Sequence, residues 1–157
     1  MKPRPGLIAR LAAHWRDLPL AVEALLTVTL AGLAIKLLSF NQILAFAARP
    51  AKQRPLSAAE REVMGARIGW AVPAVARRLP WRATCFPQGI AAQWMLRRRG
   101  IAGTFHYGAA ILNANLEAHV WVMDGDRAIV GGREAPLMRT LVQVTAGQPV
   151  LASGRTA

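Results

Sequence analysis

The single cysteine of the chain, Cys85, stands at the start of a segment, 85–99, that the apolar spacing predicts to be a helix. The thiolate is the reactive form of cysteine, and a helix N-terminus or nearby cations lower the pKa of a thiol. Both features are expected here, because Arg82 precedes Cys85 by three residues and Arg77 and Arg78 are close in sequence. A lone cysteine is more often a small buried hydrophobe. The thiol by itself is therefore a candidate nucleophile and no more.

A cysteine nucleophile needs a base, which in cysteine hydrolases is a histidine that the fold brings close. His119 is the natural candidate. In EAHVWVM it alternates with Trp121 and Met123 on one face of a predicted strand, and a polar ring between apolar neighbours must find a hydrogen-bond partner. His106, on the preceding predicted strand, is expected to be structural. A cysteine at a helix start followed by a histidine on a downstream strand favours nucleophilic catalysis more than either residue alone.

The group that would orient the imidazole is left open by the sequence. If residues 125–126 form the turn of a hairpin, His119 faces Gly132, and a shifted turn places it opposite Val130 or Gly131. None of these positions carries a carboxylate.

Three alternatives follow for the third group. Glu134 could reach back if the strand bulges at the two glycines 131 and 132, a backbone carbonyl there could hold the imidazole, or the enzyme could work as a Cys-His dyad. Asp124 and Asp126 are expected to be hairpin residues, because turn positions favour aspartate. We weigh Glu134 above them as the third member of the site.

The backbone N–H groups at the start of the 85–99 helix are the expected oxyanion donors. Gln88 is an alternative donor, although it lies one turn into the helix and is otherwise expected to be a solvated polar residue. Four tryptophans are expected to line the core or a groove: Trp70, Trp81, Trp94 and Trp121.

The elements that must position these residues are helices followed by strands. Helices are predicted over 19–38, 40–48, 57–78 and 85–99, and strands over 103–112, 118–123, 127–132 and 139–144. Ser57 and Glu60 form a capping-box pattern, and Arg97 to Gly100 suit a helix end. This order predicts an α+β fold. Residues 1–50 are expected to be apolar helices that pack on a core formed by 51–157, together one compact domain.

The composition sets outer bounds on function. A net charge of +12 favours an acidic partner, such as an anionic peptide, a nucleic acid or a membrane surface, although high basicity is also common in proteins from GC-rich genomes. One cysteine excludes an internal disulfide and fits a reducing compartment. The three histidines, His14, His106 and His119, have no cysteine partner, so no metal is expected, and no cofactor. The uncharged apolar run 24–35 is shorter than the ~20 residues that span a bilayer, which predicts a buried helix, with membrane association as the minority alternative.

Several segments resemble, position by position, the bacterial transglutaminase-like proteins of lasso peptide biosynthesis, and within them the leader peptidase or B protein family. These segments are Pro80-Trp81-Arg82, Cys85, Leu96 to Ile101 and Ala118 to Val122. The resemblance implies a papain/transglutaminase-like fold with N-terminal helices and a small antiparallel sheet. It implies Cys85 as nucleophile and His119 as base. The family usually carries an aspartate on the strand after the histidine, and this chain departs from that pattern.

The resemblance also implies a reaction: cleavage of the leader from a ribosomally made precursor peptide, before a separate ATP-dependent cyclase closes the lasso macrolactam. Fused members carry a leader-recognition domain ahead of the peptidase. The roughly fifty mostly apolar residues before the linker are expected to be too few for such a domain, so a separate leader-recognition protein and a cytoplasmic location are expected. The alternatives are another acyl-transfer enzyme on this scaffold, an amidase or transglutaminase, or a non-catalytic basic protein that binds nucleic acid or membrane.

Overall fold

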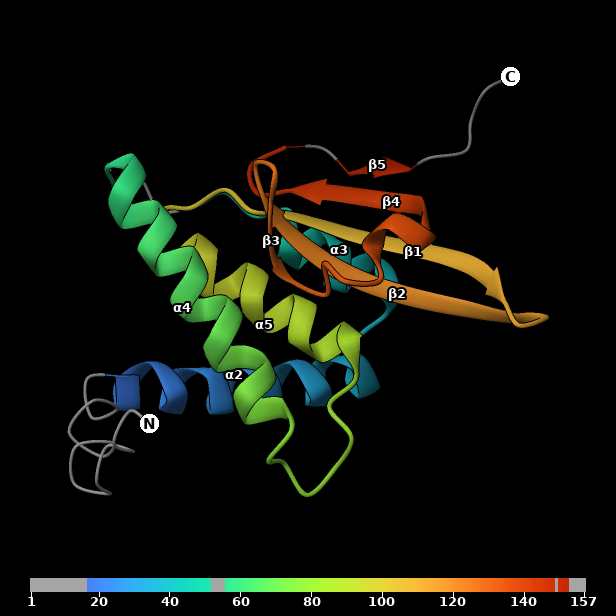
Figure 1. Ribbon diagram of the computed structural model, residues 1–157, viewed down its shortest axis with the longest axis horizontal. Helices are drawn as coiled ribbons and strands as arrows, with labels where there is room; N and C mark the ends of the chain where they lie inside the picture. Colours follow the sequence, from blue (N-terminus) through green and yellow to red (C-terminus); the bar gives the residue numbers. More distant parts are fainter. Residues whose placement is uncertain (1–16, 52–55, 149, 153–157) are drawn as a thin grey trace, which may run out of the picture.

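The chain forms helices in its first part and an antiparallel sheet in its second (Figure 1). The computed structural model describes residues 17–51, 56–148 and 150–152; His14 lies outside them. The helices are α2 (Leu18–Leu37), α3 (Phe40–Ala47), α4 (Ala58–Ala76) and α5 (Cys85–Arg98). The strands are β1 (Thr104–Leu112), β2 (Asn115–Asp124), β3 (Arg127–Val130), β4 (Arg139–Thr145) and β5 (Leu151–Ala152), with a short 3₁₀ helix, η2 (Ala135–Leu137), before β4. The predicted α+β class is confirmed.

The helix ends follow from local sequence. The Ser57 side chain accepts a hydrogen bond from the backbone N–H of Glu60, and the Glu60 carboxylate accepts one from the backbone N–H of Ser57 at 2.9 Å. This is the predicted capping box, and Ser39 and Gln42 form a second one at α3. At the other end of α5, Gly100 adopts φ +80°, which is accessible to glycine and ends the helix.

The sheet has the strand order β3-β2-β1-β4-β5 with every neighbouring pair antiparallel. Helix α5 packs against β2, and α2 and α4 pack on α5 (Figure 1). A glycine makes the close approach of helix and sheet possible. A Cβ on Gly89 would collide with Val120 of β2 and would lie 3.1 Å from the Phe105 ring. This packing sets the N-terminus of α5 beside β2.

One apolar cluster joins the helices to the sheet. Its larger completely buried side chains come from α2, α4, α5 and three strands: Val28, Ile68, Val72, Met95, Leu96, Phe105, Val122 and Val144. Side chains on both sides of residue 50 therefore meet in the same core.

Helix α2 differs from the buried helix that the sequence predicted. Its buried side chains, Leu20, Ala24, Thr27, Val28 and Ala31, form one stripe only. The opposite face exposes leucines and a valine: Leu18, Val22, Leu25, Leu26, Leu30, Leu33 and Leu37. By length and composition α2 is apolar enough to cross a membrane, a test that soluble core helices and signal sequences also pass.

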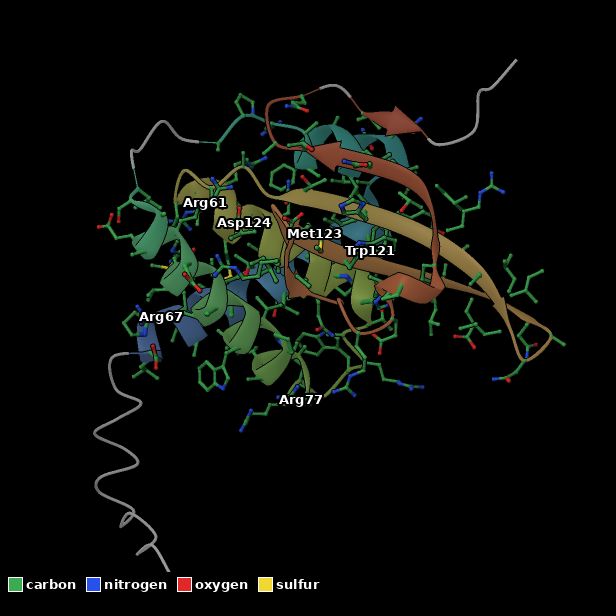
Figure 2. The ribbon with its side chains drawn as sticks, turned by 45° about the horizontal axis from the view of Figure 1, so that its top comes forward. Arg61, Arg67, Arg77, Trp121, Met123 and Asp124 are labelled. Carbon is green, nitrogen blue, oxygen red and sulfur yellow. The ribbon has the colours of Figure 1, made fainter. Side chains whose placement is uncertain are left out.

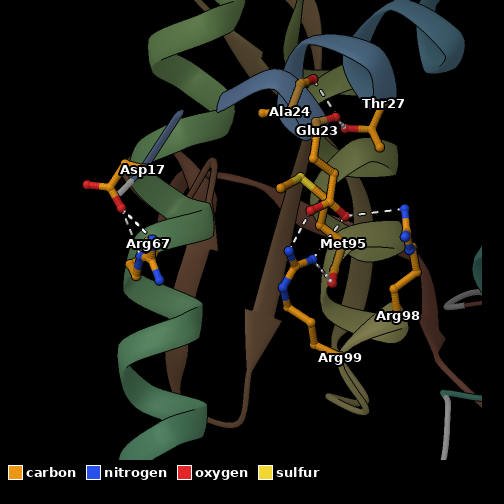
Figure 3. A network of polar contacts seen from close by, with 8 residues as sticks. All are labelled: Asp17, Glu23, Ala24, Thr27, Arg67, Met95, Arg98 and Arg99. Atoms are coloured by element: carbon orange, nitrogen blue, oxygen red, sulfur yellow. Dashed lines mark hydrogen bonds and ion pairs between the residues drawn. The ribbon is translucent and has the colours of Figure 1, made fainter. Parts of the chain in front are cut away.

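Glu23, which bounds the uncharged run 24–35 at its N-terminal end, is paired inside the fold. Figure 3 shows Glu23 facing the guanidinium groups of Arg98 and Arg99 at the end of α5, with Glu23 Oε1 3.0 Å from Arg99 Nη1 and 3.4 Å from Arg98 Nη1. The pair anchors α2 to α5. The helix spans twenty residues, close to the predicted 19–38, and its apolar surface extends beyond the uncharged run 24–35.

Candidate active site

Cys85 is the first residue of α5, as predicted. The preceding residue, Thr84, is the N-cap, but its side chain makes no capping hydrogen bond in the structure. The first N–H groups of a helix have no intrahelical partner, and together with the helix dipole they favour negative charge. The start of α5 therefore offers N–H donors to an oxyanion that forms beside Cys85.

A single cleft brings together the three residues proposed from the sequence. Cys85 from α5, His119 from β2 and Glu134 from the segment between β3 and η2 line a cavity of about 380 Å³. The remaining lining residues are Pro73, Arg77, Gln88, Val120, Val130, Gly131, Gly132 and Arg133. His106 does not line this cleft.

The imidazole of His119 is held by a backbone carbonyl. Its Nε2 lies 2.9 Å from the carbonyl oxygen of Gly131. A carbonyl oxygen only accepts hydrogen bonds, so Nε2 must be the donor, and in the neutral ring Nδ1 then carries the free lone pair. Of the three alternatives considered above, the backbone carbonyl is the one that makes a hydrogen bond to the imidazole in the structure.

Gly131 is the residue that permits this contact. Its φ is +70°, a region that side chains other than hydrogen disfavour. A Cβ at this position would collide with the carbonyl oxygen of Val120 and would lie 3.0 Å from His119 Nε2. The chain leaves β3 here and turns its carbonyl toward the imidazole.

The hairpin register explains why the carbonyl reaches the ring. Asp124 pairs with Arg127, so the turn is at residues 125–126 as predicted. The register then shifts, because Met123 pairs with Ala128 but Val122 pairs with Val130. The bulge is thus at residue 129 and not at the glycines 131 and 132, the position considered as one alternative above. Because β3 ends at Val130, the following residues curl over β2.

Glu134 approaches the same nitrogen at a longer distance. Its Oε2 lies 3.6 Å from His119 Nε2, and its side chain is about half exposed, whereas that of His119 is largely buried. This distance is too long for a hydrogen bond. The carboxylate contributes charge beside the ring, while the Gly131 carbonyl supplies the hydrogen bond.

Trp121 stacks with two imidazoles, that of His106 on β1 and that of His119 on β2. Its ring centroid lies 6.2 Å from that of His119 at an interplanar angle of 14°, and 5.1 Å from that of His106 at 4°. Trp121 is buried (labelled in Figure 2) and shields one face of the His119 ring from water. Burial lowers the pKa of His106, which favours the neutral ring beside the tryptophan.

Asp124 is a hairpin residue, as expected, because it pairs with Arg127 directly before the turn. Its side chain has a further role that the sequence did not predict: it is almost completely buried and forms an ion pair with Arg61 of α4 (Figure 2). Arg61 Nε lies 2.8 Å from Oδ1 and 3.0 Å from Oδ2. This pair raises the pKa of the Arg61 guanidinium. Asp124 therefore ties α4 to the end of β2 and does not line the cleft.

Several cleft residues depart from the sequence prediction. Gln88 is not a solvated side chain, because its amide donates a hydrogen bond of 2.8 Å to the carbonyl of Ala83 in the loop before α5. Arg77 and Arg133 line the cleft but were not proposed as site residues. Arg77 could have been proposed from its position a few residues before the segment around Cys85. No local sequence pattern distinguishes Arg133. Trp70 is half exposed and is not a core residue.

Within the described part of the chain, no group of three or more His, Cys, Asp or Glu side chains is placed to hold a metal ion.

The groups gathered in the cleft are a thiol, an imidazole with a free Nδ1, and the N–H donors at the start of α5. These are the parts that acyl transfer through a cysteine requires.

Comparison with protein-family models identifies the family to which this architecture belongs. Residues 24–144, most of the chain and all three candidate residues, match the model of the transglutaminase-like superfamily. No curated protein and no solved structure matches the chain significantly. The family domain supports a cysteine-peptidase or acyl-transfer scaffold. The helices, the sheet and the family match agree, and the chain belongs to the transglutaminase-like superfamily.

Proposed function

We propose that the protein is a cysteine peptidase that removes the leader from a ribosomally synthesised lasso precursor peptide. The observation that carries the peptidase part is the cleft, which is lined by both Cys85, at the start of α5, and His119. The Nε2 of His119 is hydrogen-bonded to the Gly131 carbonyl, which leaves Nδ1 to act as the base. The leader-peptidase part is supported by the sequence resemblance around Cys85 and His119. A separate ATP-dependent cyclase would then close the macrolactam.

The proposed mechanism uses the free nitrogen of the imidazole. His119 Nδ1 takes the thiol proton of Cys85, and the thiolate attacks the carbonyl carbon of the peptide bond between leader and core. The oxyanion of the tetrahedral intermediate is stabilised by N–H groups at the start of α5. The intermediate collapses, the C–N bond breaks, and the imidazolium gives its proton to the leaving amine. Water, deprotonated by His119, then hydrolyses the thioester and restores the thiol.

The imidazolium formed in the first step needs support from its neighbours. The Gly131 carbonyl accepts the Nε2 hydrogen bond, and Glu134 adds a negative charge 3.6 Å away. In this proposal Glu134 is the third member of the site through its charge, and the carbonyl sets the orientation of the ring.

The proposal includes partners and a location. The precursor peptide is the substrate, a separate leader-recognition protein presents it, and the reaction takes place in the cytoplasm, where the single thiol stays reduced. It requires no cofactor, no metal, no nucleic acid and no membrane.

A second function uses the same residues with a different acceptor. The superfamily match supports acyl-transfer chemistry as well as hydrolysis. If an amine replaces water in the second step, the product is a new amide. Mass spectrometry distinguishes the two, because hydrolysis leaves a free carboxylate and transfer leaves an amine adduct.

Genes for a short precursor peptide and for a leader-recognition protein are first sought next to the gene of this protein. The test is then cleavage of that precursor peptide in the presence of that leader-recognition protein. Wild type should release the leader, and Cys85→Ala should lower the rate by about 10³-fold or more. The melting temperature of Cys85→Ala should stay close to that of wild type, because only one partly buried sulfur atom is lost. Arg139→Ala, a change on β4 away from the cleft, is the matched control and should cleave normally. Unchanged cleavage by Cys85→Ala would refute the proposal.

A further inference from the structure

Two hollows continue the catalytic cleft toward α2. The first, of about 390 Å³, is bounded by the loop 79–84 and shares Arg77 and Gln88 with the cleft. The second, of about 330 Å³, lies between that loop and α2 and shares residues 81–84 with the first. Because each hollow shares lining residues with the next, the two hollows and the cleft that holds Cys85 adjoin one another along the loop 79–84. We call these two hollows the side groove.

The side groove has positive charge without a compensating carboxylate. Arg77, Arg82 and Lys36 line it, and neither hollow is lined by an Asp or a Glu. Figure 2 shows Arg77 at the end of α4, next to the loop that leads to α5. The side groove therefore favours a negatively charged occupant.

The other cations of the described chain are mostly occupied within the fold. Arg61, Arg67, Arg98 and Arg99 pair with carboxylates, as Figure 3 shows for the last three. Arg78, Arg97 and Arg127 donate hydrogen bonds to backbone carbonyls, and Arg49 stacks on Phe46. The described cations with no such partner are Lys36, Arg77, Arg82, Arg133 and Arg139, of which only Arg139 lies away from the cleft and the side groove. The unpaired charge of the described chain is concentrated where a substrate would lie.

The end of the side groove at α2 is apolar. Trp81 is about half exposed, and its indole Nε1 is 4.0 Å from where a Cβ on Gly32 would lie. Gly32 thus leaves room beside the indole, and Leu33 and Ile35 form part of the same wall. An apolar side chain can be buried against this surface.

We propose that the side groove binds the segment of the peptide substrate next to the scissile bond and selects acidic side chains there, with Arg77 and Arg82 as specificity-determining residues. An apolar residue further along the peptide packs against Trp81. This inference rests on the proposed peptidase function and adds its substrate class. A peptide is favoured over a nucleic acid because the side groove adjoins the cleft that is lined by Cys85 and His119, the residues proposed to cleave a peptide bond.

Binding is tested with the Cys85→Ala variant, which holds substrate without turnover. The probes are a mixed-sequence peptide library that contains Asp and Glu and the same library with Asn and Gln in their place. We expect about tenfold tighter binding of the acidic library, equivalent to about 1.4 kcal/mol. Adding Arg77→Glu and Arg82→Glu should abolish this preference. Adding Arg139→Glu, which makes the same kind of charge change on β4, should preserve it. Equal binding of the two libraries would overturn the proposal.

Cleavage separates this inference from the proposed function. Wild type should cut acidic members of the library preferentially, and Arg77→Glu should raise their KM about tenfold with a much smaller change in kcat. Cleavage that depends on Cys85 but shows no acidic preference refutes the side-groove proposal and leaves the peptidase intact. An acidic binding preference without cleavage of either the library or the precursor peptide presented by its leader-recognition protein refutes the peptidase, and with it the assignment of the side groove to a segment next to a scissile bond. Tighter binding of a single-stranded oligonucleotide than of the acidic library would overturn the assignment to peptides.

Discussion

Gly131 both holds the imidazole of His119 and leaves space for it. Its carbonyl accepts the Nε2 hydrogen bond at 2.9 Å, and its missing side chain leaves room for the ring and for the carbonyl of Val120. The group that orients the base is therefore part of the backbone. Its position depends on one residue with φ +70°.

Gly131→Ala tests this arrangement. The new Cβ disfavours φ +70° and collides with Val120, so we expect a loss of about 2–3 kcal/mol of unfolding free energy. We expect kcat/KM to fall by about 10²-fold, because the carbonyl moves away from His119. Gly125→Ala is the matched control. Gly125 has φ +59° with no atom near the added Cβ, so only the backbone penalty of about 1 kcal/mol is expected, with normal activity. Equal activity of the two variants would contradict the role of the Gly131 carbonyl.

Glu134→Gln tests the charge beside the ring. Because the carboxylate is half exposed and 3.6 Å from Nε2, we expect kcat/KM to decrease only about two- to fivefold, in line with an exposed ion pair. His119→Ala should lower kcat/KM by about 10³-fold. If Glu134→Gln approaches the His119→Ala value, the carboxylate and not the Gly131 carbonyl orients the base.

At the scale of elements, the position of β2 relative to the helices decides whether the site forms. Helix α5 reaches β2 across Gly89, and α4 reaches the end of β2 through Arg61 and Asp124. The first contact sets Cys85 beside the strand that carries His119. The second fixes the hairpin whose far end supplies Gly131. Two contacts between helices and β2, made through Gly89, Arg61 and Asp124, none of which lines the cleft, thus set the relative positions of the residues that do line it.

Arg61→Ala tests the second contact. It would leave the Asp124 carboxylate buried without a partner, and we expect a loss of about 2–3 kcal/mol in urea denaturation, below the full value for buried pairs because Arg61 is partly exposed. Arg127→Ala is the control, since Arg127 only donates to the carbonyl of Glu62 at an exposed site, and should cost less than about 1 kcal/mol. Similar losses for the two variants would show that the burial of Asp124 is not decisive.

At the scale of the molecule, two surfaces stand out. The side groove gathers unpaired cations next to the cleft, and α2 presents an exposed apolar face on its outer side. The interior of the molecule also holds a titratable group. Burial lowers the pKa of His106, whose ring is stacked on Trp121. Global stability should therefore respond to pH in a predictable direction.

Because the pKa of His106 is lower in the folded state than its usual 6.5, the unfolded chain binds the proton more readily. The contribution of the neutral ring is complete above about pH 6.5 and is lost as the pH falls below that value. We expect the unfolding free energy of wild type to decrease from pH 7 to pH 5. His106→Phe keeps a ring against Trp121 and should show a smaller decrease. Identical pH slopes of wild type and variant would contradict the prediction.

Local sequence determined the elements and the two groups that carry the proposed chemistry. The helix bounds, the capping box at Ser57, the turn at 125–126 and the start of α5 at Cys85 all follow from short-range rules, and the structure confirms them. These features depend on residues only a few positions apart, so a single sequence contains enough information to predict them.

Tertiary structure decided what surrounds those groups. The bulge at residue 129 depends on pairing with β2, and it places the Gly131 carbonyl, rather than a side chain, on the imidazole. The burial of Asp124 depends on Arg61, which lies 63 positions away in the sequence. The exposed face of α2 and the side groove depend on which surfaces α4 and α5 leave uncovered. Register, long-range ion pairs and exposure arise from contacts between distant segments, and no local pattern encodes them.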